Sequence, residues 1–236
     1  MANPTLGDKL LQRIDGISST SEMTMEGTIN KTGLLLLITI FGGYLGWGSQ
    51  SAMVLILSLI ASFGLSLAIV FGPHRASFLS QPYALAEGFL LGSVSSLYQR
   101  AYPSIVSNAM ILTLGCLAVM LVLYRYRIIQ VTDKLRSIIV AATMAIMLTY
   151  LIDMVMSFFG HRIPMIHEGS PLGIGFSVVM VGVAAMNLLL DFDMIETLCH
   201  RKAPKFMEWY GGFALLVTII WLYIEMLRLL SKLNKK

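Results

Sequence analysis

Long apolar runs separated by short polar segments dominate the chain. Between Lys31 and Arg75 lie 43 residues without Asp, Glu, Lys or Arg. A helical membrane span needs about 20 apolar residues, so this stretch has room for two spans joined by a tight turn. The turn is expected at residues 46–51, and Gly72-Pro73 marks the next loop.

Prolines and charges place the remaining boundaries. Pro is favoured in the first turn of a helix, so Pro82, Pro103 and Pro171 are expected to open helices. The pattern predicts seven spans, at residues 30–48, 51–72, 82–99, 103–124, 135–159, 171–198 and 206–231. We therefore expect an all-α integral membrane protein. A seven-helix transmembrane domain over residues 29–236 would follow a flexible cytoplasmic tail, residues 1–28.

Composition supports a membrane protein and excludes other classes. The chain is 56% hydrophobic and 13% charged, whereas soluble domains contain about 25% charged residues. Disorder requires low hydrophobicity and high charge, and a small disulfide scaffold would need more than two Cys. The basic pI does not indicate nucleic acid as a partner, because the Lys and Arg residues lie at span edges near lipid headgroups.

Loop charges predict the orientation. With seven spans, the N-terminal tail and the loops on its side together carry eleven Lys and Arg residues, and the loops on the other side carry Arg100 and Arg162. Cytoplasmic loops are enriched in Lys and Arg, so the N-terminus is expected in the cytoplasm and the C-terminus outside a bacterial inner membrane. The basic C-terminal end runs against this rule. A re-entrant last span or a miscounted earlier span is the alternative.

Acidic residues inside the predicted spans are the candidate functional groups. An ionisable residue in a bilayer is costly and marks function by default. No Lys or Arg is expected deep in any span, so such acids must be neutral, hydrogen-bonded, paired with one another, or in contact with water or cations. Ca²⁺ prefers oxygen ligands, and Asp191 is a candidate ligand. The predicted proton-sensing or cation site comprises Asp191, Glu225, Glu87 and Asp193, with Asp153 and Glu208 as secondary candidates.

Depth along the helices separates these acids. A helix rises 1.5 Å per residue, so Asp191 lies roughly 10 Å from the cytoplasmic end of its span and Glu87 about 7 Å from the same side. Asp153 and Glu225 lie roughly 27–29 Å from their cytoplasmic ends. We therefore expect an inner layer of Glu87, Asp191 and Asp193, and an outer layer of Asp153 and Glu225.

Several enzyme and cofactor classes lack their required residues. The last predicted span has no Lys before Lys232 to bind retinal, and all four His lie in predicted loops. His167-Glu168 is not followed by the second His of a zinc-protease motif. We expect no enzymatic activity and no bound cofactor, with Ca²⁺ or H⁺ as possible transported ions.

Three segments resemble the Bax inhibitor-1 family, in its bacterial YccA-like branch. They are residues 82–92 (PYALAEGFLLG), residues 187–196 (NLLLDFDMIE), and residues 208–230, which run from Glu208-Trp209-Tyr210 to WLYIEMLRLL. The resemblance implies a seven-helix bundle with a central last helix. It also implies a pH-sensitive cation leak, chiefly of Ca²⁺.

The resemblance also implies a latch formed by two acids, on helices six and seven, that share a proton. The helix-six acid corresponds to Asp191. The helix-seven acid corresponds to Glu225 by its Leu-Tyr-Ile context. Counting back from Leu227-Arg228 places it instead near Thr218, and Glu87 or Glu208 are alternative partners for Asp191.

Two functions remain open at this level. The first is a pH-sensitive cation leak channel or exchanger, gated by protonation of the carboxylates. The second is a non-transporting membrane protein that modulates, or is degraded by, a membrane-anchored AAA protease, for which residues 1–28 would be an unfoldase handle. The expected assembly in the lipid bilayer is a monomer or weak homo-oligomer.

Overall fold

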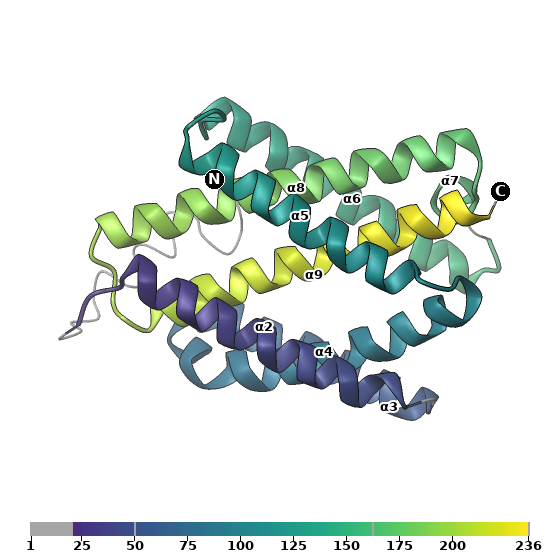
Figure 1. The fold of residues 1–236 in the computed structure, drawn as a ribbon, viewed down its shortest axis with the longest axis horizontal. Coiled ribbons are helices and arrows are strands. Elements are labelled where there is room, and N and C mark those ends of the chain that lie inside the picture. The colour runs from purple at the N-terminus through teal and green to yellow at the C-terminus, as the bar shows by residue number, and fades with distance from the viewer. Residues whose placement is uncertain (1–20, 50, 162, 236) are drawn as a thin grey trace. The chain divides into compact units, whose positions relative to one another are not determined.

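The structure is a computed structural model that describes residues 21–49, 51–161 and 163–235. Its elements, of which the α-helices are labelled in Figure 1, are α2 (Met25–Trp47), α3 (Ala52–Phe71), η1 (Pro73–Arg75), α4 (Ala76–Ala101), α5 (Ile105–Arg125), α6 (Asp133–Phe158), α7 (Pro164–His167), α8 (Pro171–His200) and α9 (Met207–Asn234). The described residues form no β-strand beyond the single bridge between Glu22 and Pro204. The all-α class is therefore confirmed.

Six of these helices are long and apolar enough to cross a membrane: α2, α3, α5, α6, α8 and α9. The predicted count was seven, and the difference is α4. This 26-residue helix contains the predicted third span but carries Glu87 and several Ser residues. The chain is thus a multi-pass helical protein with six candidate spans among its described residues.

Local capping explains several helix starts. Thr24 caps α2 by accepting a hydrogen bond from Gly27 N, and Thr132 caps α6 in the same way through Leu135 N. A capping hydroxyl satisfies one of the free amides of the first turn. Helix α8 begins at Pro171 as predicted. The predicted tail covers residues 1–28, of which residues 1–20 lie outside the described residues. The last four residues of the predicted tail belong to α2, which begins at Met25.

Two prolines do not open helices as predicted. Pro82 lies inside α4, which begins six residues earlier, directly after the 3₁₀ turn η1. An internal Pro leaves one carbonyl of the preceding turn without its amide partner, and this is tolerated where another group can bond to that carbonyl. Pro103 precedes α5, which begins only at Ile105 because Ser104 adopts a left-handed conformation with φ 66°.

The chain divides into two compact units. Within the described residues, unit 1 comprises residues 102–192 and 218–235, and unit 2 comprises residues 21–101 and 193–217. Helices α8 and α9 are each divided between the two units: α8 is divided after Phe192, and α9 before Thr218.

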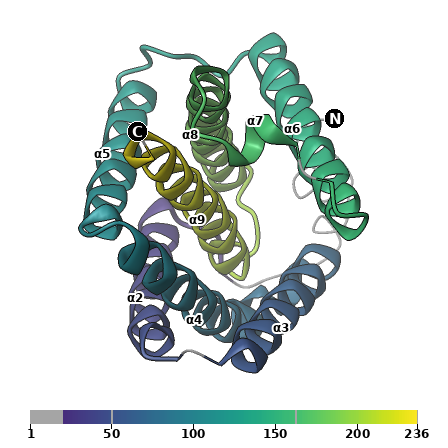
Figure 2. The same cartoon turned by 90° about the vertical axis from the view of Figure 1, so that its right-hand side faces the viewer.

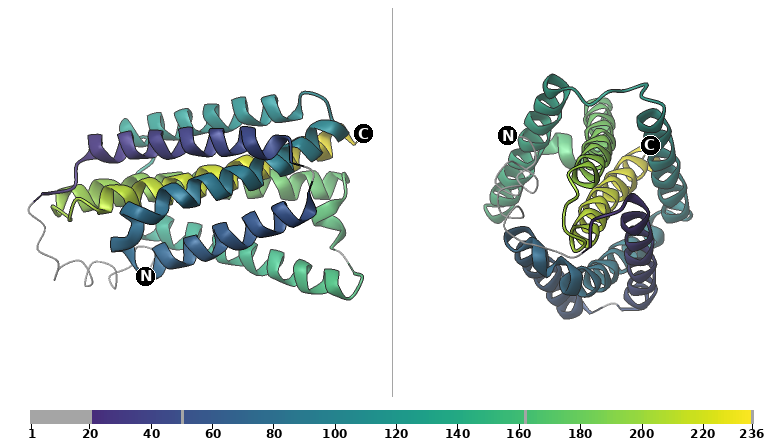
Figure 3. Two further views of the ribbon diagram at one scale, coloured as in Figure 1. Left: turned by 90° about the horizontal axis from the view of Figure 1, so that it is seen from below. Right: turned by 90° about the vertical axis from the view of Figure 1, so that its left-hand side faces the viewer.

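Close packing of α2 against α4 organises unit 2. A Cβ added at Gly46 would overlap the backbone of Phe89, and one added at Gly92 would overlap the backbone of Gly43. Small residues spaced four apart let helix backbones approach closely in a membrane. Figure 2 shows α4 between α2 and α3, and the right panel of Figure 3 shows the same group from the opposite side.

Hydrogen bonds and ring contacts between side chains join the elements of unit 1. On α8, Asn187 donates a hydrogen bond to the Thr143 hydroxyl of α6, and Phe192 contacts the ring of Tyr124 of α5. The short helix α7 lies between α6 and α8 (Figure 2). The candidate acids are placed on this framework.

Candidate functional site

Asp191 is buried on α8 and bonds to α9. Its side chain is 3% exposed, and Oδ2 accepts a 2.5 Å hydrogen bond from Thr218 Oγ1. Thr218 is also buried. Thr218 is the position that counting back from Leu227-Arg228 assigns to the helix-seven acid of the resemblance, and its side chain is a hydroxyl, not a carboxyl.

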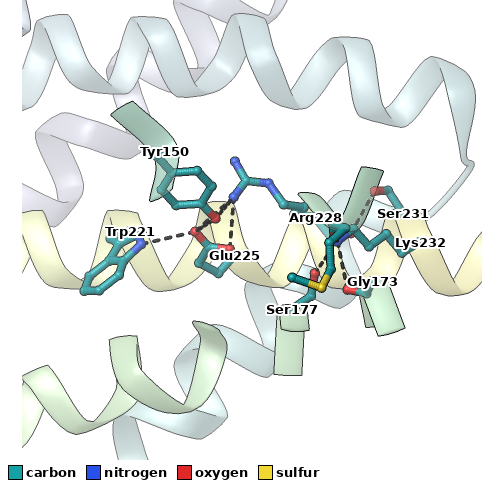
Figure 4. Close-up of polar contacts among 9 residues, drawn as sticks. Tyr150, Gly173, Ser177, Trp221, Glu225, Arg228, Ser231 and Lys232 are labelled. Carbon is teal, nitrogen blue, oxygen red and sulfur yellow. Dashed lines mark hydrogen bonds and ion pairs between the residues drawn. The ribbon is translucent and has the colours of Figure 1, made fainter. Parts of the chain in front are cut away.

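Glu225 lies seven residues beyond Thr218 on α9, about 10 Å further along the helix. Its Oε1 accepts hydrogen bonds from Tyr150 Oη (2.8 Å) and Trp221 Nε1 (3.2 Å), and Arg228 Nη1 lies 3.2 Å from both carboxylate oxygens (Figure 4). Arg228 also donates to the Tyr150 hydroxyl and stacks over its ring, 4.6 Å from the centroid.

The expectation that Glu225 has no basic partner is therefore wrong. The helix itself supplies the partner, because residues three apart share a face and the long Arg228 side chain reaches back across one turn. The carboxylate is 1% exposed and the Arg228 side chain 26% exposed, so the guanidinium links a buried acid to the surface.

Asp153 has a separate set of partners. Its Oδ1 accepts a 3.0 Å hydrogen bond from Ile163 N, and Oδ2 lies 2.8 Å from His167 Nε2. Asp153 thereby ties α6 to the segment that contains α7. An open pocket of about 350 Å³ adjoins this acid and is lined by Tyr150, Asp153, Met154, Ser157 and Phe158.

Glu208 and Glu87 lie in unit 2. The Glu208 carboxylate accepts hydrogen bonds from Thr24 N and Thr24 Oγ1, each at 2.9 Å, and forms an ion pair with Lys31. Glu208 thus has a basic partner as well, because Lys31 extends from the second turn of α2. Glu87 is half-buried on α4 and bonds to Ser62 of α3.

The predicted acids thus have different partners in their own units. Asp191, Glu225 and Asp153 belong to unit 1, where each contacts a different set of groups. Asp193 is half-buried in unit 2. Across residues 21–49, 51–161 and 163–235, no three His, Cys, Asp or Glu side chains gather closely enough to hold a metal ion.

The sequence identified the acids but not the residues that contact them. Tyr150 lies 75 residues before Glu225, and His167 lies on the helix that follows Asp153, across a loop. No periodic signal marks either residue. The sequence places Lys232 in the basic C-terminal end, just beyond the last predicted span, yet it is 1% exposed. Its position four residues after Arg228, on the same helix face, was the one available signal.

The fold and these carboxylates define a multi-pass helical membrane protein with acids buried in its spans. Residues 3–235 match the family model described as Bax inhibitor 1 like, and the chain belongs to that family. No match to the chain is found among curated proteins. The resemblance noted in the three sequence segments is thereby confirmed at the level of the family.

Proposed function

We propose that this protein is a pH-sensitive cation leak channel or exchanger of the Bax inhibitor-1 type, with Ca²⁺ as its main cation. Protonation of Asp191 is its gating event, and no enzymatic step is involved. The same proposal assigns the protein to the YccA-like branch and to a bacterial inner membrane, with its N-terminus in the cytoplasm.

The hydrogen bond between Asp191 and Thr218 carries this proposal. A buried ionised carboxylate is costly unless it is paired, and one neutral hydroxyl does not neutralise its charge. The hydroxyl can donate to the carboxylate or accept from the carboxylic acid. Gain or loss of a proton therefore changes the contact between α8 and α9, which is the kind of local event that can bias a gate.

Ca²⁺ flux into liposomes as a function of pH tests the proposal. Asp191→Asn keeps the shape and hydrogen bonding of the side chain but cannot titrate, so we expect flux that no longer varies with pH. Glu196→Gln removes a more exposed acid from the same helix and is the matched control, with a profile like that of the wild type. Absence of flux in the wild type, or identical profiles for Asp191→Asn and the wild type, would contradict the proposal.

Thr218 provides a second, constructive test. Thr218→Asp places a second carboxyl beside Asp191, and two coupled carboxyls titrate as a unit. We expect the pH dependence of flux to shift relative to the wild type. Thr218→Val, which cannot donate the hydrogen bond, separates the loss of that bond from the gain of a charge.

The alternative is a non-transporting partner or substrate of a membrane-anchored AAA protease. Its support is the anchoring of the segment that follows the N-terminal 20 residues: Met23 N donates to Ala203 O, and Lys205 N donates to Ser21 O. A force applied at the N-terminus would reach the loop between α8 and α9 through these bonds. Deletion of residues 2–20 should slow turnover by that protease, and unchanged turnover would argue against this function.

A further inference from the structure

The amino group of Lys232 is enclosed by three oxygen atoms near the C-terminal end of α9. Nζ donates hydrogen bonds to Met165 O (3.0 Å), Gly173 O (2.9 Å) and Ser177 Oγ (2.8 Å). Figure 4 shows the side chain directed toward Gly173 and Ser177 of α8. The lysine side chain is 1% exposed, and Ser177 is equally buried.

All three acceptors are neutral. An ammonium has three donors, so these oxygens use its full capacity. Among the described residues no carboxylate forms an ion pair with Lys232. Buried Lys is rare unless it is paired. Here carbonyl and hydroxyl dipoles replace the hydration shell of the cation, as carbonyl oxygens do for K⁺ in selectivity filters.

The oxygens come from elements other than the helix that supplies the ammonium. Met165 belongs to α7, whereas Gly173 and Ser177 lie one turn apart on α8. Gly173 is close-packed, because a Cβ there would overlap the carbonyl oxygen of Glu168. Asp153 further fixes the segment that contains α7 through Ile163 N and His167. The three oxygens therefore form a cage that belongs to α7 and α8. The Lys232 side chain extends into this cage from α9 and brings its ammonium group to the oxygens.

We propose that Met165 O, Gly173 O and Ser177 Oγ form a binding site for a monovalent cation, and that the Lys232 ammonium is its tethered occupant. The ligand class is a singly charged ion near the size of ammonium, such as K⁺ or methylammonium. The site joins the end of α9 to α7 and α8 by recognising a cation. It is distinct from the acids of the proposed leak and does not depend on that function.

Thermal unfolding of purified full-length variants in detergent tests this site. Lys232→Ala removes the amine and leaves space for a free cation, whereas Lys232→Met removes the charge but fills the space with an apolar chain. Each variant is measured in chloride salts of K⁺, methylammonium and N-methylglucamine, the last being too large for the cage. Lys232→Ala combined with Ser177→Ala removes one ligand.

We expect methylammonium or K⁺ to raise the unfolding temperature of Lys232→Ala with saturation, by about 3–6 °C at ten times Kd, relative to N-methylglucamine. The wild type and Lys232→Met should show no such dependence, and the double variant a weaker one. Folding of Lys232→Ala only when a small cation is present would equally support the site. Equal responses in all variants, or no cation dependence of Lys232→Ala, including failure to fold in every salt, would overturn the proposal.

Discussion

Glu225 and Arg228 lie one turn apart on α9, and Tyr150 of α6 contacts both of them. The three side chains form a connected network in which the carboxylate is almost fully buried. Removing one partner of such a network leaves the other with an unsatisfied polar group, which is more costly than removing both. At the residue scale, the buried Glu225 carboxylate is therefore compensated by the side chains that contact it.

Arg228→Met should destabilise the protein by about 1–3 kcal/mol, because it leaves the Glu225 carboxylate without its cation. Glu225→Gln should have a smaller effect, since an amide can still bond to Tyr150 and Trp221. Unfolding in detergent measures both changes and that of the double variant. If the destabilisation of the double variant equals the sum of the two single effects, the interaction free energy between Glu225 and Arg228 is zero and the two side chains are not coupled.

At the scale of elements, the contact between α2 and α4 depends on residues without side chains. Gly46 faces the backbone of Phe89, and its carbonyl also accepts a hydrogen bond from Ser93 Oγ at 3.1 Å. Backbone atoms cannot move aside as a side chain can. A methyl group at this contact must therefore separate the two helices.

Gly46→Ala should destabilise unit 2 by about 1–3 kcal/mol, the usual effect of overpacking. Gly33→Ala is the matched control on the same helix, where an added Cβ meets no atom within 4 Å. That control should stabilise α2 by about 0.5–1 kcal/mol, because Ala favours helix more than Gly does. Thermal unfolding compares the two, and equal effects would show that the close approach of α2 to α4 is not limiting.

At the scale of the whole molecule, the positions of Arg228 and Lys232 within α9 change the orientation argument. The positive-inside rule applies to charges in loops, and neither Arg228 nor Lys232 lies in one. Without them, four basic residues remain on the predicted outer side against eleven on the cytoplasmic side. The number of basic residues on the predicted outer side thus falls from six to four.

Reporter fusions test this topology. A fluorescent protein that folds only in the cytoplasm should fluoresce on the N-terminus, and alkaline phosphatase, active only outside, should be active on the C-terminus. Seven spans place the termini on opposite sides. Fluorescence from both termini would instead indicate an even number of spans, as expected if the six apolar helices cross the membrane and α4 does not.

Sequence by itself determined the class of the protein and most of its helices. Runs of about 20 apolar residues in a chain with 13% charge leave few alternatives to membrane helices, because unpaired backbone groups are costly in lipid. It also identified the buried acids, since a charge within such a run is conspicuous. It misplaced the starts at Pro82, which lies inside α4, and at Pro103, where the left-handed conformation of Ser104 delays the start of α5.

Only the tertiary structure decided what each acid contacts. Asp191 meets Thr218, Glu225 meets Tyr150 and Arg228, and Asp153 meets His167. Helical periodicity places a residue on a face of its own helix, but it says nothing about which helix covers that face. Lys232 is the clearest case: from sequence it belongs to a basic tail, whereas the carbonyl groups of α7 and α8 make its burial possible.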